Sequence, residues 1–409
     1  MSGLIPVAEA LSRILASVAR PVEAESVPLA RAAGRVLAAP VASTRTQPPF
    51  PASAMDGYAV RAADAGTVGA RLTLAGTSAA GHGFSGTLQP GEAVRIFTGA
   101  PVPEGADAIL IQEDAEAEGD MVHVREAVEQ GRFIRREGLD FAAGQVLLAE
   151  GMTLDARRLA LAAAAGHPRL DVRRRPRVAI LATGDELVEP GATPAWDQIV
   201  ASNSLALAAL AEEAGAEAID LGIAADDHAA LEAAFRRARE AKADLLITLG
   251  GASVGDHDLV QAALAREGLE LGFWRVASRP GKPLMHGRLG DMLVIGLPGN
   301  PVSSIVCGLL FVVPAIRAML GDPQAGADRT EPALLGRDLP ANDGRADYMR
   351  AGLTMQAGQL PVATPENRQD SSMLAVLGRS EALLVRAPHA PPAKAGEPCR
   401  IIRLDRRLV

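Results

Sequence analysis

Met292-Leu-Val-Ile-Gly-Leu297 is an apolar run that passes directly into the polar turn Pro298-Gly-Asn-Pro-Val-Ser303. Two upstream segments share this arrangement of apolar run and polar turn: Arg177-Val-Ala-Ile-Leu-Ala182 before Thr183-Gly-Asp-Glu-Leu187, and Asp244-Leu-Leu-Ile-Thr-Leu249 before Gly250-Gly-Ala-Ser-Val-Gly-Asp-His-Asp258. Such runs predict buried strands, and in an open α/β sheet ligands bind beyond the carboxyl ends of the strands. Turns that carry Asp, Glu, Ser and free backbone N–H groups therefore predict a polyanion site with a place for a cation, which favours an enzyme.

Downstream of position 176, strand-like and helix-like segments alternate. The expected strands are 177–182, 217–223, 244–249 and 292–297, and the expected helices are 203–214, 228–241, 258–266 and 301–319. Strands separated by helices form a mostly parallel sheet that helices cover on both faces, so we expect a central three-layer α/β domain over 176–325. In its last helix, Asn300 is a suitable cap, Pro301 suits the first helical position and Pro314 is expected to kink the helix.

The flanking sequence predicts further units, so the expected fold class is a multidomain α/β protein. Residues 47–146 are rich in Gly, Val and Thr in short apolar runs, which favours an inserted β-rich module. Around this module, residues 1–46 and 147–175 are expected to form an N-terminal helical and linking region, whose helix 6–18 can pack on the central domain. Over 328–409, alternating short runs predict a small C-terminal β-barrel-like domain.

Bulk properties narrow the possible functions. The 409 residues carry a formal net charge of −8, which argues against broad nucleic-acid binding because that needs a basic face. The two cysteines, Cys307 and Cys399, are too few for a disulfide framework or a multi-cysteine metal site. No basic leader precedes the first apolar residues, and the apolar run 305–316 is too short to span a bilayer. We therefore expect a cytoplasmic protein without nucleic-acid or membrane partners.

The longest of the three polar turns has two interpretations. Gly250 and Gly251 let the backbone approach a ligand closely, and Ser253 can donate a hydrogen bond to it. Taken alone, however, a Gly-Gly pair is more typical of a tight strand-to-helix turn. Asp256 and Asp258 suit the cap of the next helix, and they equally suit Mg²⁺, which binds one or two carboxylates together with phosphate.

Arg275, Arg279 and Lys282 surround two prolines. Cations on a proline-stiffened segment form a fixed positive pocket that suits phosphate or another oxyanion, whereas the alternative is a solvated charged loop. The place of this segment between two turns that face the predicted site favours binding. In the first of the three turns, capping explains Thr183, but Glu186 has less structural explanation.

Eight segments, taken together and in order, resemble the molybdopterin molybdenumtransferase (MoeA) family, whose animal counterpart is the C-terminal part of gephyrin. The segments cover nearly the whole chain: Pro48-Pro-Phe50, Ser53-Ala-Met-Asp-Gly-Tyr-Ala59, Arg95-Ile-Phe-Thr-Gly-Ala-Pro101, Glu104-Gly-Ala-Asp-Ala108, Thr183-Gly-Asp-Glu-Leu187, Thr248-Leu-Gly-Gly-Ala-Ser-Val-Gly-Asp256, Arg279-Pro-Gly-Lys-Pro283 and Gly296-Leu-Pro-Gly-Asn-Pro-Val-Ser303. Any one segment is a weak signal, but the ordered set is highly specific.

This resemblance implies an activity and an assembly. Members of the family transfer molybdenum from molybdate to the dithiolene sulfurs of adenylylated molybdopterin, cleave the adenylate, and release AMP and molybdenum cofactor with the assistance of Mg²⁺. The resemblance also implies an elongated homodimer, with the site between the α/β domain of one subunit and the inserted β module of the other. The implied partners are the molybdopterin adenylyltransferase and the molybdoenzymes that receive the cofactor.

The resemblance further assigns roles to residues, including two that composition alone places in ordinary turns. The implied catalytic residues are Asp56, Thr98, Asp140, Glu186, Asp227 and Asp258, of which Glu186 and Asp258 would bind the metal. The residues implied to bind adenylylated molybdopterin are Gly250, Gly251, Ser253, Pro298 and Pro301. The residues implied to bind molybdate are Arg279, Lys282, Ser303, Arg350 and Ser371. The set is chemically coherent, because cations and hydroxyls hold a dianion while carboxylates hold a cation beside the phosphate.

The chain departs from the family pattern at several positions. Many relatives carry Asp where this chain has Pro51 and Glu where it has Leu139, and some carry lysine at Arg275 and Arg279. Because arginine keeps the charge and gains bidentate geometry, we expect altered anion affinity rather than lost function. Two alternatives stay open: a molybdopterin adenylyltransferase on the same α/β domain, which the long flanking regions disfavour, and a non-catalytic cofactor-binding or scaffold protein.

Overall fold

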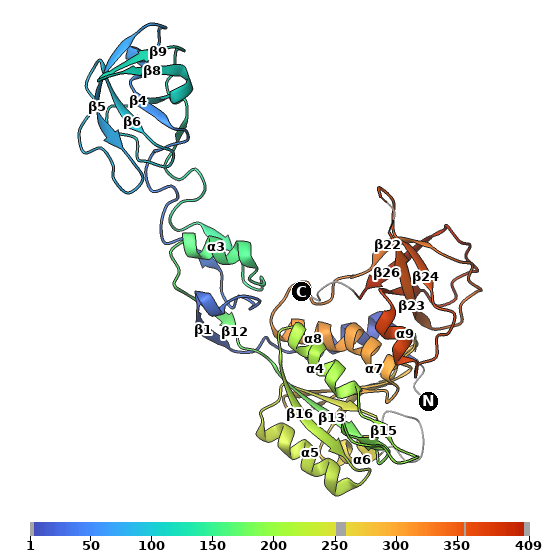
Figure 1. Ribbon diagram of the computed structural model, residues 1–409. Helices are drawn as coiled ribbons and strands as arrows, with labels where there is room; N and C mark the ends of the chain where they lie inside the picture. The colour runs from blue at the N-terminus through green and yellow to red at the C-terminus, as the bar shows by residue number, and fades with distance from the viewer. Residues whose placement is uncertain (1–3, 251–258, 356, 405–409) are drawn as a thin grey trace.

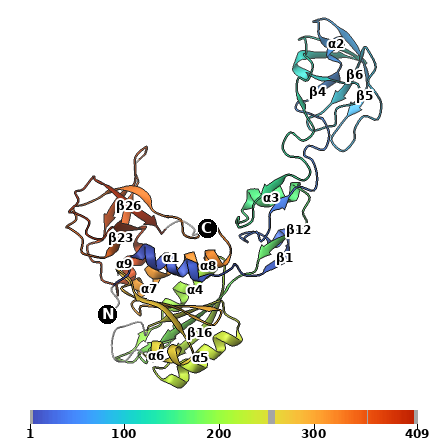
Figure 2. The same cartoon turned by 180° about the vertical axis from the view of Figure 1, so that it is seen from behind.

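The molecule is elongated, with a β module at one end and two packed domains at the other (Figure 1). The computed structural model describes residues 4–250, 259–355 and 357–404. A slender segment that contains α3 (Ala156–Ala164) connects the module to the central domain. Figure 2, the view from behind, shows α1 (Val7–Ser17) lying on the central domain beside α8 (Val313–Met319).

The central sheet has six strands in the order β16-β13-β17-β21-β20-β18. Their bounds in this order are Glu217–Ala224, Arg177–Thr183, Leu245–Leu249, Met292–Leu297, Pro283–Leu289 and Glu270–Arg275. The first four strands run parallel, whereas β20 and β18 add an antiparallel edge. Strands β17 and β21 are buried along their whole length, as expected of a parallel sheet covered on both faces.

Helices cover both faces of this sheet. On one face, α1, α4 (Asn203–Glu213), α7 (Pro301–Cys307) and α8 enclose one apolar core. On the other face, α5 (His228–Glu240) and α6 (Leu259–Arg266) enclose a second core. The predicted three-layer, mostly parallel α/β domain is thus confirmed, and α1 joins it as expected. The antiparallel edge formed by β18 and β20 was not predicted.

The predicted kink near Pro314 takes the form of a π-helical turn. A π-helical segment, Gly308–Val312, separates α7 from α8, which begins just before the proline. Proline lacks an N–H and its ring clashes with a carbonyl in the preceding turn, so the wider helical turn accommodates it. The continuous helix Pro301–Met319 is apolar and long enough to cross a membrane, but 78% of its most apolar window is buried, as in the core helix of a soluble domain.

The inserted module contains a six-stranded mixed sheet in the order β7-β4-β6-β5-β9-β8. The bounds of β4 to β9 are Gly57–Val60, Arg71–Ser78, Glu92–Ile96, Ala108–Ile111, Ala115–Glu118 and Met121–Val124, and α2 spans Ala62–Ala65. A two-stranded sheet pairs β3 (Ala52–Ser53) with β10 (Ile134–Arg135). In the connecting segment, β1 (Ala24–Pro28) pairs with β12 (Arg169–Arg173), and β2 (Val41–Ala42) pairs with β11 (Val146–Leu148).

The C-terminal region is a small closed barrel, which confirms the expected barrel-like domain. Its strands follow the order β23-β24-β22-β26-β25, and β25 pairs back with β23 to close the ring. The bounds of β22 to β26 are Glu331–Leu335, Ala346–Thr354, Val362–Pro365, Ala382–Arg386 and Pro398–Arg403, and α9 spans Leu374–Arg379. From the central domain, β19 (Ser278–Arg279) adds to β23 and joins the two domains. The domain boundaries stated from the sequence stay predictions.

Candidate active site

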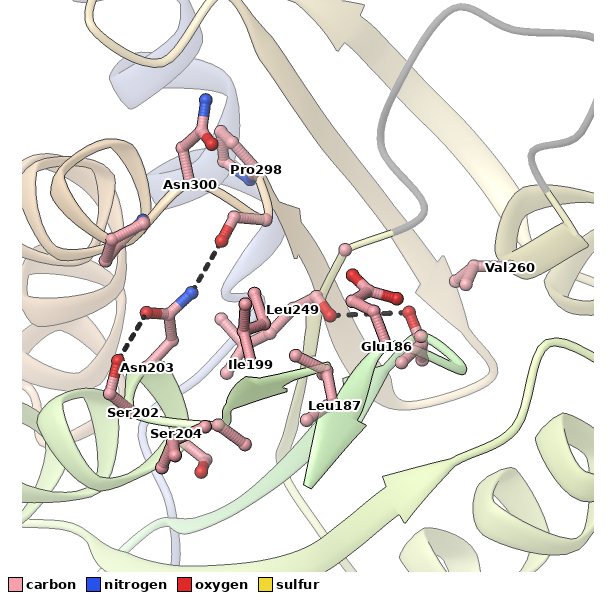
Figure 3. A pocket seen from close by; sticks show the side chains of 18 of the residues that line it. Glu186, Leu187, Ile199, Ser202, Asn203, Ser204, Leu249, Val260, Pro298 and Asn300 are labelled. Atoms are coloured by element: carbon pink, nitrogen blue, oxygen red, sulfur yellow. Dashed lines mark hydrogen bonds between the residues drawn. The ribbon is translucent and has the colours of Figure 1, made fainter. Parts of the chain in front are cut away.

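A cavity of about 810 Å³ opens where the parallel strands β13, β17 and β21 end. Residues that follow these strands line it, of which Gly250 is the described one after β17, together with the start of α4 and the short parallel pair β14 (Leu187–Val188) and β15 (Ile199–Val200). Figure 3 shows Glu186 on one side of the cavity and Pro298 and Asn300 on the other. The carboxyl ends of these strands meet at one cavity, as expected, and the binding of a ligand there stays a prediction.

Gly250 packs closely against the end of β13. Its φ is +98°, and a Cβ atom at this position would lie 2.8 Å from the Thr183 carbonyl oxygen and 2.9 Å from its hydroxyl. The Gly250 N–H donates to the Leu297 carbonyl over 3.2 Å, and the Thr183 hydroxyl donates to the Leu249 carbonyl over 3.3 Å. Only glycine accepts both this backbone conformation and this contact, so the glycine fixes the distance between the three turns.

Carboxylates gather on one side of the cavity. Glu186 and Asp226 line it, and the Asp226 N–H donates to the Asp185 carboxylate over 3.1 Å. Burial raises the pKa of the Asp226 carboxyl, and the charges of Asp185 and Glu186 raise it further. Repulsion of this kind is relieved by a bound cation, and Mg²⁺ prefers carboxylate oxygens. Within the described ranges, no group of three His, Cys, Asp or Glu residues could hold a metal ion by itself. The carboxylate oxygens of this wall therefore fit Mg²⁺ only as a partial set of ligands, which substrate phosphate would complete.

Asp227, which was assigned a site role, caps α5. Its Oδ1 atom accepts a hydrogen bond from the Ala230 N–H over 2.9 Å, and its backbone is extended, as is usual for an N-cap residue. The neighbouring Asp226 lines the cavity, but Asp227 does not. The catalytic assignment of Asp227 stays a prediction, and the structure gives the residue a structural role in α5.

The opposite wall is held by the C-terminal barrel. The Asn300 side chain precedes α7 but makes no capping bond, contrary to the expectation from the sequence. Its Nδ2 atom instead donates to the Ser371 hydroxyl over 2.9 Å. The Ser371 carbonyl accepts from the Val302 N–H over 3.1 Å and thereby takes up a backbone donor in the first turn of α7. Ser371 therefore docks the barrel on the cavity wall.

Known proteins share this whole architecture. Three family models match the chain in succession: the MoeA N-terminal region (domains I and II) over 5–166, a probable molybdopterin-binding domain over 179–318, and the MoeA C-terminal region (domain IV) over 332–404. A molybdopterin molybdenumtransferase of Haemophilus influenzae is 36% identical over 391 residues, which is 95% of this chain and 96% of that protein. The chain belongs to the MoeA family.

Further relatives agree with this membership. The molybdopterin molybdenumtransferase 2 of Mycobacterium tuberculosis (strain H37Rv) is 39% identical over 357 residues, covering 85% of this chain and 87% of that protein. The crystal structure of a MoeA protein from Pyrococcus horikoshii superposes with a TM-score of 0.84 at 29% identity, covering 98% of this chain and 99% of that one. The MoeA likeness therefore extends over all three parts of the chain rather than over the α/β domain alone.

The cationic residues assigned from the MoeA resemblance lie where the central domain meets the barrel. The Arg279 guanidinium binds Asp343 over 3.0 Å and also pairs with Asp347, and both of these acids belong to the barrel region. Lys282 is exposed, and Ser303 is buried in the first turn of α7. Only Arg279 of these three has a charged partner among the described residues. An anion that binds Arg279 would compete with Asp343 and Asp347 for it.

Arg350, assigned to molybdate, is almost completely buried at 1% exposure. Its Nε atom donates to Gln369 Oε1 over 3.2 Å, and its Nη1 atom donates to the Asp370 carbonyl over 2.8 Å and to the Met373 carbonyl over 3.4 Å. Burial lowers the pKa of this guanidinium. Arg350 therefore holds the loop that carries Ser371, and its direct contact with molybdate stays a prediction.

Three further assigned residues lie in the module, away from the cavity. The Thr98 N–H and hydroxyl both donate to Asp56 Oδ1, over 2.7 and 2.8 Å, and these bonds lower the pKa of Asp56. Asp140 is exposed in the loop after β10, where its N–H donates to the Gln47 carbonyl over 3.0 Å. No module residue lines the cavity, and Figure 1 shows the module at the opposite end of the molecule from the central domain.

Of the remaining residues assigned to the site, some lie in the part of the chain that the structure describes and some do not. Gly250, Pro298 and Pro301 line the cavity. Gly251, Ser253 and Asp258 lie outside the described residues, so their roles stay predictions. Conversely, the cavity includes Asp226 and Asn203, which the sequence did not single out. Asp226 is adjacent to the assigned Asp227, and Asn203 is the first residue of a predicted helix. Their positions next to the end of an element were the only sequence signals that could have identified them as site residues.

Proposed function

We propose that this MoeA-family chain is a molybdopterin molybdenumtransferase, which transfers molybdenum from molybdate to adenylylated molybdopterin and releases AMP and molybdenum cofactor. The observation that carries this proposal is the cavity at the ends of β13, β17 and β21, which carries carboxylates on one wall and a barrel-anchored turn on the other. Its volume of about 810 Å³ is within the range of cavities that bind small ligands. Two relatives named molybdopterin molybdenumtransferase match the chain in sequence over 96% and 85% of their own length.

In this reaction a water molecule would add across the phosphoanhydride of the adenylate, so that AMP leaves as one phosphate monoester, molybdopterin keeps the other, and a proton passes to solvent. Glu186 and Asp226 would hold Mg²⁺ at the acidic wall, together with Asp258. Bound there, Mg²⁺ would offset the phosphate charge at the bond that breaks. Arg279 and Lys282 are proposed to attract molybdate, because a planar guanidinium and an ammonium group both bind oxyanions. The turn at Pro298 and Pro301 would position the substrate against the acidic wall.

We also infer that two copies of the chain build each site. Asp56 and Thr98 match the family motif, yet they lie in a module that contributes nothing to the cavity of the same chain. An antiparallel pair with twofold symmetry would bring the module of one copy to the cavity of the other.

Mixing two inactive variants tests this inference. In a mixture of Asp56→Asn and Glu186→Gln chains, a heterodimer contains one site with both residues intact, provided that the site is shared between subunits. Random pairing then restores about a quarter of the wild-type activity, since half of the dimers are mixed and each has one of two sites intact. If each site were built within a single chain, the mixture would stay inactive.

The proposed reaction is tested with purified protein, adenylylated molybdopterin, molybdate and Mg²⁺. We expect release of AMP that depends on molybdate, and formation of molybdenum cofactor that activates a recipient apoenzyme. Adenylylation of molybdopterin from ATP, without AMP release from the adenylate, would assign the chain to the adenylyltransferase class instead. Binding without any turnover would support a cofactor-binding or scaffold protein.

The same proposal places the chain in a sequence of partners. An adenylyltransferase would supply the substrate, and molybdoenzymes would receive the cofactor. We propose the cytoplasm as the site of action, and the formal charge of −8 supports the absence of a nucleic-acid partner.

A further inference from the structure

One amide side chain ties two walls of the cavity together. Asn203 is the first residue of α4, and its Nδ2 atom donates to the Gly299 carbonyl over 2.7 Å. Figure 3 shows this bond crossing from the start of α4 to the turn between β21 and α7. Asn203 and Gly299 both line the cavity.

The helix itself does not require this asparagine. Asparagine is a poor helix former in a helical position, and here its side chain makes no capping bond. The preceding residue, Ser202, occupies the N-cap position and also lacks a side-chain capping bond, although its hydroxyl lies 3.5 Å from Asn203 Oδ1. The amide donor of Asn203 is thus used for the neighbouring turn rather than for its own helix.

The turn that receives this bond has little support of its own. Pro298 lacks an N–H group, so this position of the turn cannot donate a backbone hydrogen bond. A Cβ atom added at Gly299 would lie 3.8 Å from Gly250 Cα, so the turn packs directly on the second glycine-rich turn. On the barrel side, Asn300 binds Ser371. On the cavity side, Asn203 holds the Gly299 carbonyl.

We propose that Asn203 is a positioning residue, which fixes the turn 298–300 as the substrate-facing wall of the cavity. This inference rests on the proposed function, because it takes the cavity as the site for the adenylate. The neutral amide is essential in two respects. A carboxylate at this position could not donate to the Gly299 carbonyl, and its charge would repel an anionic ligand as well as the carbonyl oxygen.

The variant Asn203→Asp tests this role, because the introduced carboxyl group can donate a hydrogen bond only when it is protonated. At pH 8 we expect the affinity for AMP and kcat/KM to fall roughly tenfold to a hundredfold, the effect of a lost hydrogen bond and an added repulsion. The Gly299 carbonyl oxygen, which would face the introduced carboxylate, should raise its pKa. Between pH 8 and 5 the affinity of the variant relative to wild type should therefore recover, which a merely structural change would not produce.

Two further variants complete the test. Asn203→Ala removes the donor without adding charge, so its affinity should fall without recovery at low pH, and amide exchange in the turn 298–300 should accelerate. Asn367→Asp is the matched control, since Asn367 is exposed in the barrel and uses its oxygen as an acceptor from Arg337. Its AMP affinity should stay within twofold of wild type.

The outcomes separate this inference from the proposed function. If wild type binds AMP and turns over, but Asn203→Asp binds AMP as wild type does or shows the same deficit at every pH, Asn203 is not a positioning residue. If Asn203→Asp does not fold, unchanged affinity and unchanged amide exchange in Asn203→Ala overturn the inference. If wild type neither binds nor releases AMP, the proposed function fails, whereas faster exchange of the turn in Asn203→Ala still confirms the mechanical role.

Discussion

Replacing Arg350 with methionine should destabilise the barrel and the cavity wall together. Methionine keeps the length of the apolar stem but removes a guanidinium that is 1% exposed and donates to Gln369, Asp370 and Met373. Each acceptor left unpaired in a buried site costs about 1–3 kcal/mol, while removal of a buried charge offsets part of that loss. The net expectation is a loss of about 2–4 kcal/mol, or roughly 4–16 °C in Tm for a cooperative unit of about 200 residues.

The assay is differential scanning calorimetry, followed by urea unfolding at constant pH. Arg400→Met is the matched control, because Arg400 belongs to the same barrel but its side chain is 50% exposed, so water replaces its lost partners. We expect this control to lose at most about 1 kcal/mol. The reasoning is refuted if Arg350→Met and Arg400→Met lower Tm equally, since burial would then contribute nothing to the role of Arg350.

Three further predictions concern the central domain. Gly250→Ala should lower the free energy of unfolding by about 2–5 kcal/mol, because φ is +98° and the new Cβ would lie 2.8 Å from the Thr183 carbonyl oxygen. Gly191→Ala is the matched control: its φ is +95°, but no atom lies within 4 Å of the new Cβ, so it should cost only about 1–2 kcal/mol. Asp226→Asn should stabilise the metal-free protein at pH 7 and reduce the rise in Tm caused by Mg²⁺, because the folded-state pKa of Asp226 is raised and its ionised form is disfavoured. Burial lowers the pKa of His286 to about 4, so wild type should lose up to about 3 kcal/mol as pH falls from 6.5 towards 4, and His286→Phe should lose less.

Each of these predictions has a contradicting result. Equal losses of Tm in the two glycine variants would show that the contact with Thr183 is not restrictive. An unchanged Mg²⁺ response in Asp226→Asn would exclude that carboxylate from the metal site. Acid should destabilise the wild type because, between pH 6.5 and about 4, His286 binds a proton in the unfolded state but not in the folded state. Urea unfolding at pH 7 and pH 4.5 measures the difference, and equal acid sensitivity in His286→Phe would contradict it.

The parallel part of the fold was readable from the sequence because apolar periodicity dominates there. The predicted strands 177–182, 244–249 and 292–297 are mostly apolar runs that lead into polar turns, whereas 217–223 contains Glu217 and Asp220 and forms the edge strand β16. The antiparallel edge, β18 and β20, escaped prediction for a physical reason. Pro280 and Gly281 interrupt the pattern between the two strands, Pro283 is the first residue of β20, and β20 is held in the sheet by pairing with β21 and β18.

The sequence predicted site residues correctly only where they directly follow a strand. Glu186 was found because it follows β13, and it does line the cavity. Asn203 and Asp226 were missed because tertiary packing, rather than spacing along the chain, brings the start of α4 and the loop after β16 to the same place. Arg350 was assigned by resemblance alone, and its burial beneath the 369–373 loop has no signal in the local sequence.

A crystal structure of the protein, in the dimeric form proposed above, with AMP, Mg²⁺ and molybdate tests the central claim most directly. We predict AMP phosphate beside Glu186 and Asp226 in the cavity at the ends of β13, β17 and β21, with molybdate next to Lys282. Asp56 of the second copy should lie at the mouth of the same cavity. AMP or molybdate bound at a separate surface, with this cavity empty, would contradict the proposed site.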